Sequence, residues 1–258
     1  MITRLVKDRR SLAVLRRIDR PAAVLLAIAQ AVTAAVGWFV DPIWLAVTVA
    51  VQLALGGIGA VRVIGAGPAE LGFARYAMPA TAGIAATLVG RLLPGGLSLL
   101  LVPIVAVLLW SVWYLELRLA RGSGGLTIGG LLHTVILFSA AAGLLDLFGP
   151  KAWPTPLILV AVFALPVALR SAEARGAVGA EGVGQALLHL LVVMEIGAGA
   201  VLLDLPITIL AALMALAFYA WAGAVDALRG GTSGRAVAIE YGAFVLLGLL
   251  VALLLHRS

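Results

Sequence analysis

The chain has 258 residues, of which 63% are hydrophobic and 12% charged, and its mean hydropathy is +1.15. A water-soluble domain of this length needs far more polar surface, so the composition excludes one and indicates an integral membrane protein. The absence of cysteine excludes disulfides, thiolate catalysis, iron–sulfur clusters and cysteine-ligated zinc. The formal charge of +6 is explained by membrane orientation, as argued below, and predicts no nucleic-acid partner.

The first 21 residues form a basic segment ahead of the first long apolar run. Four apolar residues of this segment share one face of a helix, with basic residues on the other: Leu5, Leu12, Leu15 and Ile18. This pattern predicts an amphipathic helix over 5–18 that lies on the inner membrane face. The apolar run that follows is as long as a membrane span, which does not fit a cleavable signal peptide. We therefore divide the chain into residues 1–21 and a single polytopic helical membrane domain over 22–258.

Nine apolar segments follow the basic segment, each near the roughly 20 residues that a helix needs to cross the hydrocarbon core of a bilayer. They are predicted at residues 22–40, 43–64, 73–93, 97–117, 126–148, 154–170, 184–203, 206–227 and 236–256. The connectors are too short to fold as soluble domains, so any chemistry must lie in the helix bundle or at its cytoplasmic mouth. The predicted fold is an all-α integral membrane protein with about nine transmembrane helices.

The basic residues collect on one side of these predicted spans. With the N-terminus in the cytoplasm, that side holds 15 of the 18 basic residues: Arg4, Lys7, Arg9, Arg10, Arg16, Arg17, Arg20, Arg62, Arg75, Arg118, Arg121, Arg170, Arg175, Arg229 and Arg235. The other side keeps Arg91, Lys151 and Arg257. This is the positive-inside pattern. It predicts a multi-pass protein of the cell (inner) membrane, with a cytoplasmic N-terminus and an outside C-terminus.

After the first span, the sequence indicates four tandem helical hairpins. Each hairpin begins near a proline on the outer side, where the missing N–H costs nothing in the first helical turn: Pro42, Pro94, Pro154 and Pro206. Segments 131–139 and 187–195 are the most similar, because His133 matches His189 and Ser139 matches Glu195. We interpret this as an internal repeat of hairpins. The alternative is chance similarity between two leucine-rich helices.

Glycines inside the predicted spans are expected to let helices approach closely. Helix association in lipid depends on such packing, because burial of apolar side chains gives little advantage there. The sequence offers Gly56, Gly83, Gly197 and Gly199 for this purpose.

Glu195 is the most costly residue of the chain, because it lies near the middle of the seventh predicted span. A carboxylate at that depth must be protonated, paired or hydrated. We interpret Glu195 as a candidate proton or ligand site, with Gln52 and Ser139 as polar side chains at similar depth. The alternative is a protonated or hydrogen-bonded carboxyl group that joins helices. Either role predicts that Glu195 faces protein or a cavity.

His133 and His189 occupy matched positions of the two similar segments. Imidazole is an axial ligand of haem iron, and two facing histidines could clamp one macrocycle, either haem or chlorophyll. The alternative is a structural hydrogen bond, for which Gln185, one turn before His189, is a local partner. The sequence contains no group of residues with metal-ligand spacing and identifies no cofactor.

The cytoplasmic loops combine glycine with arginine and could contact lipid headgroups. The candidate residues are Arg121, Arg175, Arg229 and Arg235. Exposed N–H groups next to arginine can hold a phosphate, although plain turns are the alternative. None of the loops has the Lys-Ser/Thr ending of a P-loop, and we find no catalytic motif in the chain.

The nine-span layout resembles the topology of intramembrane prenyltransferases of the UbiA type. That resemblance implies aspartate-rich motifs for Mg²⁺ and diphosphate in two cytoplasmic loops, but the corresponding residues 62–72 and 170–184 contain no aspartate. The departure argues against prenyltransferase activity.

Three functions are therefore considered. The favoured one is a non-catalytic membrane subunit or scaffold that packs in a larger assembly, binds a lipophilic molecule such as a lipid, quinone or carotenoid, or does both. The second is a secondary transporter of a small or lipophilic substrate, coupled through Glu195 and favoured by internal repeats. The third is a lipid-modifying intramembrane enzyme of UbiA-like topology without the aspartate motifs. The expected partners are membrane lipids and other membrane proteins.

Overall fold

The computed structural model describes residues 2–65, 72–93, 99–119, 126–149 and 154–257; of 2–19, 126–127 and 255–257 it describes the backbone only. These residues form helices joined by short turns, with no strand among them. The long helices are α1 (Ile2–Phe39), α2 (Pro42–Leu53), α4 (Met78–Val89), α6 (Val102–Leu119), α7 (Leu126–Phe148), α8 (Thr155–Ala174), α9 (Gly179–Leu202), α10 (Ile207–Arg229) and α11 (Gly234–Arg257). The short pieces are the π-helix η1 (Ala54–Ile58), α3 (Gly59–Ile64) and the 3₁₀ turns η3 (Ala74–Tyr76), η4 (Gly90–Leu92) and η5 (Leu99–Leu101).

Eight helices of the described chain are long and apolar enough to cross a membrane. They are Arg20–Phe39, Pro42–Ile64, Leu99–Leu119, Ile128–Phe148, Thr155–Ala174, Gly179–Leu202, Ile207–Arg229 and Gly234–Leu254. The chain is thus an all-α membrane protein, as predicted. The third predicted span, 73–93, is different, because it consists of the 12-residue helix α4 between two 3₁₀ turns.

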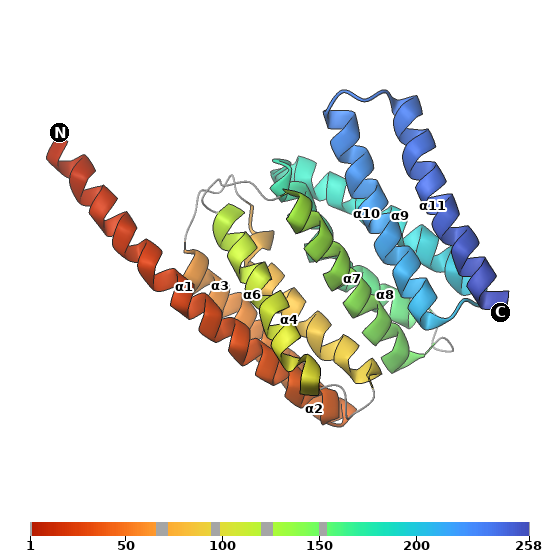
Figure 1. Ribbon diagram of the computed structural model, residues 1–258, viewed down its shortest axis with the longest axis horizontal. Coiled ribbons are helices and arrows are strands. Elements are labelled where there is room, and N and C mark those ends of the chain that lie inside the picture. The colour runs from red at the N-terminus through yellow and green to blue at the C-terminus, as the bar shows by residue number, and fades with distance from the viewer. Residues whose placement is uncertain (1, 66–71, 94–98, 120–125, 150–153, 258) are drawn as a thin grey trace.

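Helix α1 is continuous from the basic segment into the first span and carries Pro21 within it. Figure 1 shows its N-terminal part projecting away from the bundle as a single straight extension. The predicted boundary near residue 21 is therefore not a break between two helices. The placement of the N-terminal part on the membrane surface stays a prediction.

Helix α4 lies at the centre of one half of the bundle, packed against α1, α2, α6, α7 and α8. In the other half, α10 packs against α7, α9 and α11, and α8 packs against α9 (Figure 1). Small residues permit these close contacts: α1 buries Ala23, Ala27 and Ala31 along one stripe. Helix α11 lies at the edge of the bundle, and only 11% of its apolar 18-residue stretch is buried.

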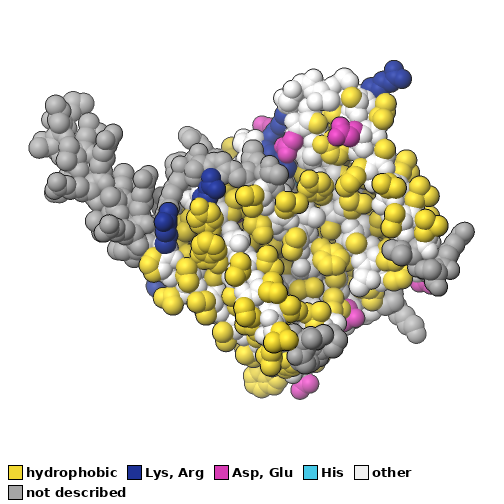
Figure 2. All heavy atoms as spheres, viewed as in Figure 1, with side chains coloured by type: hydrophobic (Ala, Val, Ile, Leu, Met, Phe, Trp, Pro, Cys, Tyr) yellow, Lys and Arg dark blue, Asp and Glu magenta, His cyan; other side chains and the backbone are white. Residues whose placement is uncertain are grey.

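The surface of the bundle is mainly apolar. Figure 2 shows hydrophobic side chains covering most of the face in view, while the visible Lys and Arg side chains lie along one margin, toward the N-terminal extension and the turn between α10 and α11. An apolar belt with charges at its margin is the surface expected of a protein whose solvent is lipid.

Two of the predicted packing glycines make very close contacts, Gly56 with the backbone of another helix and Gly83 with side chains. A Cβ atom on Gly56 would lie 2.2 Å from the backbone nitrogen of Ala80, and one on Gly83 would lie 2.3 Å from the Gln52 side-chain oxygen. Gly197 contacts Met214, whereas a Cβ on Gly199 would have no neighbour within 4 Å. The prediction of close backbone approach is therefore confirmed for Gly56. Gly83 and Gly197 instead make room for side chains, and Gly199 has no such contact within the described chain.

Candidate functional site

A large lateral groove lies over α4, with a volume of about 880 Å³. Its floor is one stripe of α4 and the preceding turn, formed by Ala77, Thr81, Ile84 and Leu88 at helical spacing. One wall comes from α2 and η1, and the other comes from the C-terminal end of α7 and from α8. Residues at its rim are exposed, for example Phe73 (68%) and Val162 (66%), so the groove opens sideways toward the membrane.

The π-helix η1 brings the α2 wall onto α4. A π-bulge widens one helical turn by a residue, and such bulges are frequent at functional sites. Here it places Gly56 directly against the backbone of Pro79 and Ala80. The next residue, Gly57, lines the groove, and a Cβ there would meet nothing within 4 Å. The α2 segment is thereby held to α4 along one edge while the groove beside it stays open.

The groove offers a ligand almost no polar groups. Among its side chains only Tyr76 and Thr81 carry polar atoms, and both are engaged within the protein. The Thr81 hydroxyl donates to the Ala77 carbonyl at 2.9 Å, and the Tyr76 hydroxyl donates to the Gly65 carbonyl at 2.9 Å. The lining therefore suits an uncharged, apolar chain and gives no attraction to an ion.

Pro166, within α8, adds one polar feature to the far wall. Proline has no N–H, so the carbonyl of Val162, four residues earlier, has no donor from within the helix. Val162 and Pro166 both line the groove. A hydroxyl group on a bound molecule could therefore find an acceptor about midway along α8.

A cluster of neutral polar side chains holds α1, α2, α4 and α6 together beside this groove. Gln30 donates to the Pro79 carbonyl at 2.8 Å and accepts from the Trp113 indole at 2.8 Å. The Gln52 side chain donates to the backbone carbonyl of Gln30 at 2.9 Å and to the Thr87 hydroxyl at 3.2 Å. The predicted site residue Gln52 thus has a structural role, although its Oε1 atom has no hydrogen-bond partner.

The three residues proposed as a shared site, Glu195, Ser139 and Gln52, lie in different surroundings. Ser139 lines a separate cavity of about 70 Å³ between α4, α6 and α7. Glu195 is exposed on α9, so the expectation that this chain covers it is not met. No hydrogen bond or cavity wall found among the described residues joins any two of the three.

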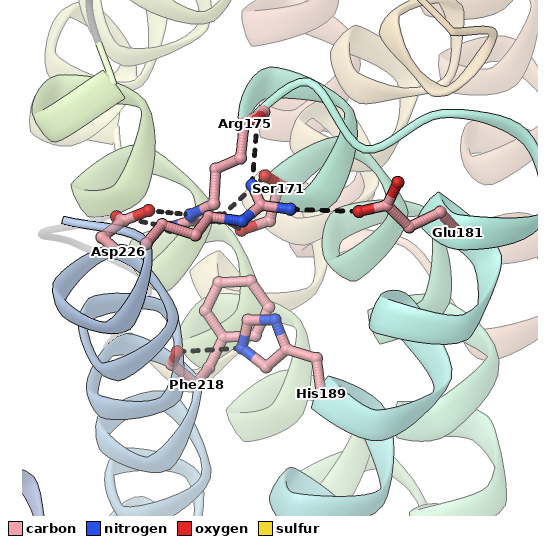
Figure 3. A network of polar contacts seen from close by, with 7 residues as sticks. Ser171, Arg175, Glu181, His189, Phe218 and Asp226 are labelled. Atoms are coloured by element: carbon pink, nitrogen blue, oxygen red, sulfur yellow. Dashed lines mark hydrogen bonds and ion pairs between the residues drawn. The ribbon is translucent and has the colours of Figure 1, made fainter. Parts of the chain in front are cut away.

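The two histidines are both buried, with 3% exposure for His133 and 4% for His189. The Nε2 atom of His189 lies 2.9 Å from the Phe218 carbonyl oxygen, and the two rings stack with centroids 3.9 Å apart (Figure 3). The predicted partner Gln185 instead donates to Glu181 at 2.9 Å, so that assignment is wrong. The contact of His189 is with Phe218 on α10, a different helix, and the sequence around His189 could not predict it.

His133 has a buried Nε2 atom without a hydrogen-bond partner. The cavity beside it is about 10 Å³ in volume, near the smallest size that can hold one water molecule. In this conformation it has no room for a tetrapyrrole, and the Phe218 ring and carbonyl occupy the space beside His189. The binding of a macrocycle between the two histidines therefore stays a hypothesis, and the space beside the two side chains does not support it.

The arginines proposed as headgroup contacts are partly engaged within the protein. Arg175 donates to Asp226 at 2.6 Å and to the Ser171 carbonyl at 2.7 Å, and also contacts the Ser171 hydroxyl (Figure 3). Arg229 donates to the Arg175 carbonyl at 2.9 Å and lies 3.4 Å from Glu181. These contacts tie the turn between α8 and α9 to the end of α10. Arg235 is exposed at the start of α11, and Arg121 lies outside the described residues.

A buried cluster of charges that was not predicted from the sequence lies next to Tyr76, at one end of the groove. Arg170 donates two bonds of 3.0 Å and one of 2.7 Å to the Glu116 carboxylate, and its Nη1 atom lies 3.6 Å from Glu173. Glu173 accepts from the Ala74 backbone at 3.2 Å, so the cluster fixes the turn that leads into α4. The sequence contained a hint of this ion pair, because Glu116 and Arg170 lie in the last turns of two helices that are predicted to end on the same side.

Gly72 makes this arrangement sterically feasible. It has a φ of 72°, a conformation that favours glycine, and a Cβ there would lie 2.0 Å from the Glu173 carboxyl carbon. Arg75 completes the cluster and donates to the Tyr76 hydroxyl at 2.6 Å. Tyr76 also lines the groove, so the charged cluster and the apolar groove meet at this side chain.

No protein-family model, curated protein or solved structure matches this chain, so the site is interpreted from its own geometry. Among the described residues, no three His, Cys, Asp or Glu side chains come together as a metal site.

Proposed function

We propose that this protein is a non-catalytic membrane protein that holds a lipophilic molecule in the groove over α4. The observation that carries the proposal is the groove itself: a volume of about 880 Å³, an apolar lining and a lateral opening. This volume lies within the range of about 300–1,000 Å³ typical of ligand pockets. The groove runs from Pro42 to Gly57 along its α2 wall, or about 22 Å at 1.5 Å per residue.

The dimensions and lining favour a long, uncharged chain as the ligand. A length of about 22 Å covers most of the ~30 Å hydrocarbon core, so an acyl or isoprenoid chain lying along the membrane normal would fill it. Lipids, quinones and carotenoids share such a chain. The Val162 carbonyl would accept a hydrogen bond from a hydroxyl group on the chain, which a saturated hydrocarbon tail could not provide.

We further propose nine membrane crossings, with α4 and its flanking turns as the third. Twelve α-helical residues and two 3₁₀ turns of three residues give a length of about 30 Å, enough to cross if the helix is covered by protein. Burial of most α4 residues supports this placement. The positive-inside distribution then puts the N-terminus in the cytoplasm and the C-terminus outside.

The transporter alternative has less support from the geometry. Glu195 does not line the groove, and the groove offers no charged side chain to a coupling ion. The enzyme alternative would need a reactive group that lines the groove, and the charged cluster of Arg75, Glu116, Arg170 and Glu173 does not line it.

The proposal is tested by blocking the groove with a side chain at Gly57. Because a Cβ at this position meets no atom, Gly57→Phe should fold and project its ring into the groove. The matched control is Gly184→Phe, where the Cβ also meets nothing and the position does not line the groove. Gently purified protein should contain a stoichiometric lipophilic molecule, detected by mass spectrometry of extracted lipid and by absorbance.

We expect the bound amount to fall at least about tenfold in Gly57→Phe, which corresponds to about 1.4 kcal/mol, and to stay unchanged in Gly184→Phe. A purified wild-type protein that carries no enriched lipophilic molecule would contradict the proposal. Equal amounts in wild type and Gly57→Phe would contradict it as well.

A further inference from the structure

We infer that the outer face of α9 is a docking surface for a transmembrane helix of a different membrane protein, one that carries a Lys or Arg opposite Glu195. The inference goes beyond the groove and does not rest on it, because no residue of this face lines the groove.

The exposed residues of α9 form a seam of the kind that helices use to pack together. Leu188 (54% exposed), Leu191 (53%) and Leu202 (84%) lie on one face with Glu195. Their spacing of three, four and seven residues matches the a and d positions of a heptad. In this chain the seam faces outward, and a partner helix could pack its side chains between these leucines. A polar residue at one such position specifies the partner and its register at a cost in stability.

Glu195 makes an uncovered seam unfavourable. It lies seven residues before Leu202, the last residue of α9, which places it about 10 Å inside the outer end of the helix. Charged side chains at the membrane centre cost about 2.5–3.5 kcal/mol on translocon-insertion scales and normally face protein or water. No hydrogen bond or salt bridge to the Glu195 carboxylate is found among the described residues of this chain. A basic side chain on a neighbouring helix would compensate the Glu195 carboxylate at this depth.

Charge complementarity favours a basic helix over a second copy of the chain. A two-fold contact through this seam would bring Glu195 against itself. If Glu195 met another face of a second copy, it would also find no cation inside the apolar helices. The sequence has no Lys or Arg in four long stretches, which are residues 21–61, 92–117, 122–150 and 176–228. A different protein with a basic residue inside a transmembrane helix would satisfy the carboxylate at the required depth.

The test uses the full chain reconstituted in phosphatidylcholine bilayers with synthetic transmembrane peptides. One peptide is a Leu/Ala helix with a single Lys at the depth of Glu195, and its pair has Leu at that position. A third peptide places the Lys one heptad deeper. Association is measured by energy transfer between a donor on the protein and an acceptor on the peptide, for wild type, Glu195→Gln and the control Glu240→Gln, which removes an exposed carboxylate from α11.

We expect wild type and Glu240→Gln to bind the Lys peptide at least about tenfold more tightly than the Leu peptide, and Glu195→Gln to bind the two equally. Wild type should bind the peptide with the deeper Lys no more tightly than the Leu peptide. This comparison uses wild type alone, so it does not depend on the folding of any variant. Equal binding of the Lys and Leu peptides by wild type would overturn the inference. Self-association of labelled wild-type copies that is lost in Glu195→Gln would overturn it in favour of a second copy.

Discussion

The bundle contains two buried polar clusters that use different chemistry. The amide cluster of Gln30, Gln52, Thr87 and Trp113 is neutral, and Gln30 and Gln52 lie midway along their apolar helices. The charged cluster of Glu116, Arg170 and Glu173 lies in the last turns of α6 and α8. Depth accounts for the contrast, because ionised groups cost most at the centre of the bilayer and less near its surface. Neutral amides join helices where charges would be too expensive.

The two clusters should therefore respond very differently to mutation. Removal of one member of a buried ion pair leaves an uncompensated charge, whereas loss of a neutral hydrogen bond in a membrane costs much less. The following predictions compare the two clusters, beginning with the largest effect.

Arg170→Met should be the most destabilising single change. It leaves Glu116, which is 1% exposed, without its partner, and breaking such a pair costs about 3–5 kcal/mol. The double variant Glu116→Leu/Arg170→Met should recover most of the loss, because both charges are then removed. Reversible unfolding in detergent would measure both. A double variant no more stable than the single one would show that the pair is not the dominant interaction at this site.

Gly83→Ala should disrupt the amide cluster through its geometry. The new Cβ would lie 2.3 Å from Gln52 Oε1 and 2.7 Å from Gln30 Nε2, and both side chains are held by hydrogen bonds. Overpacking of this kind costs about 1–3 kcal/mol. Gly184→Ala is the matched control, since a Cβ there meets nothing and alanine favours helix. Equal stability of the two variants would mean that the cluster can rearrange freely.

Gln52→Leu should have a smaller effect. It removes two hydrogen bonds, to the Gln30 carbonyl and the Thr87 hydroxyl, but it also removes the unpaired Oε1 atom. Side-chain hydrogen bonds between membrane helices average about 0.6 kcal/mol, so we expect a loss near 1 kcal/mol. The same unfolding measurement applies. A loss as large as that of Arg170→Met would remove the distinction between the two clusters.

The sequence predicted the long helices because apolar length alone marks a membrane span. It did not predict that α4 would be almost entirely buried, since buried and lipid-facing spans have the same composition. It identified Gln52 as polar at depth but not its partner Gln30, because depth gives no information on which helices are neighbours. The pairing of Arg170 with Glu116, 54 residues earlier in the chain, could not be predicted for the same reason.

The smallest effect is expected for the network at the turn between α8 and α9, which resembles the charged cluster in composition but not in burial. The side chain of Asp226 is 49% exposed, and Arg175 keeps its bonds to Ser171 if Asp226 is replaced. Ion pairs with this exposure contribute about 0–1 kcal/mol, and salt screens them. Asp226→Asn should therefore cost less than about 1 kcal/mol at low salt and nothing measurable at 1 M salt. Unfolding of wild type and variant at both salt concentrations checks this. A salt-independent loss above about 2 kcal/mol would show that this network is desolvated like the Glu116–Arg170 pair, and that burial does not separate the two kinds of charge in this protein.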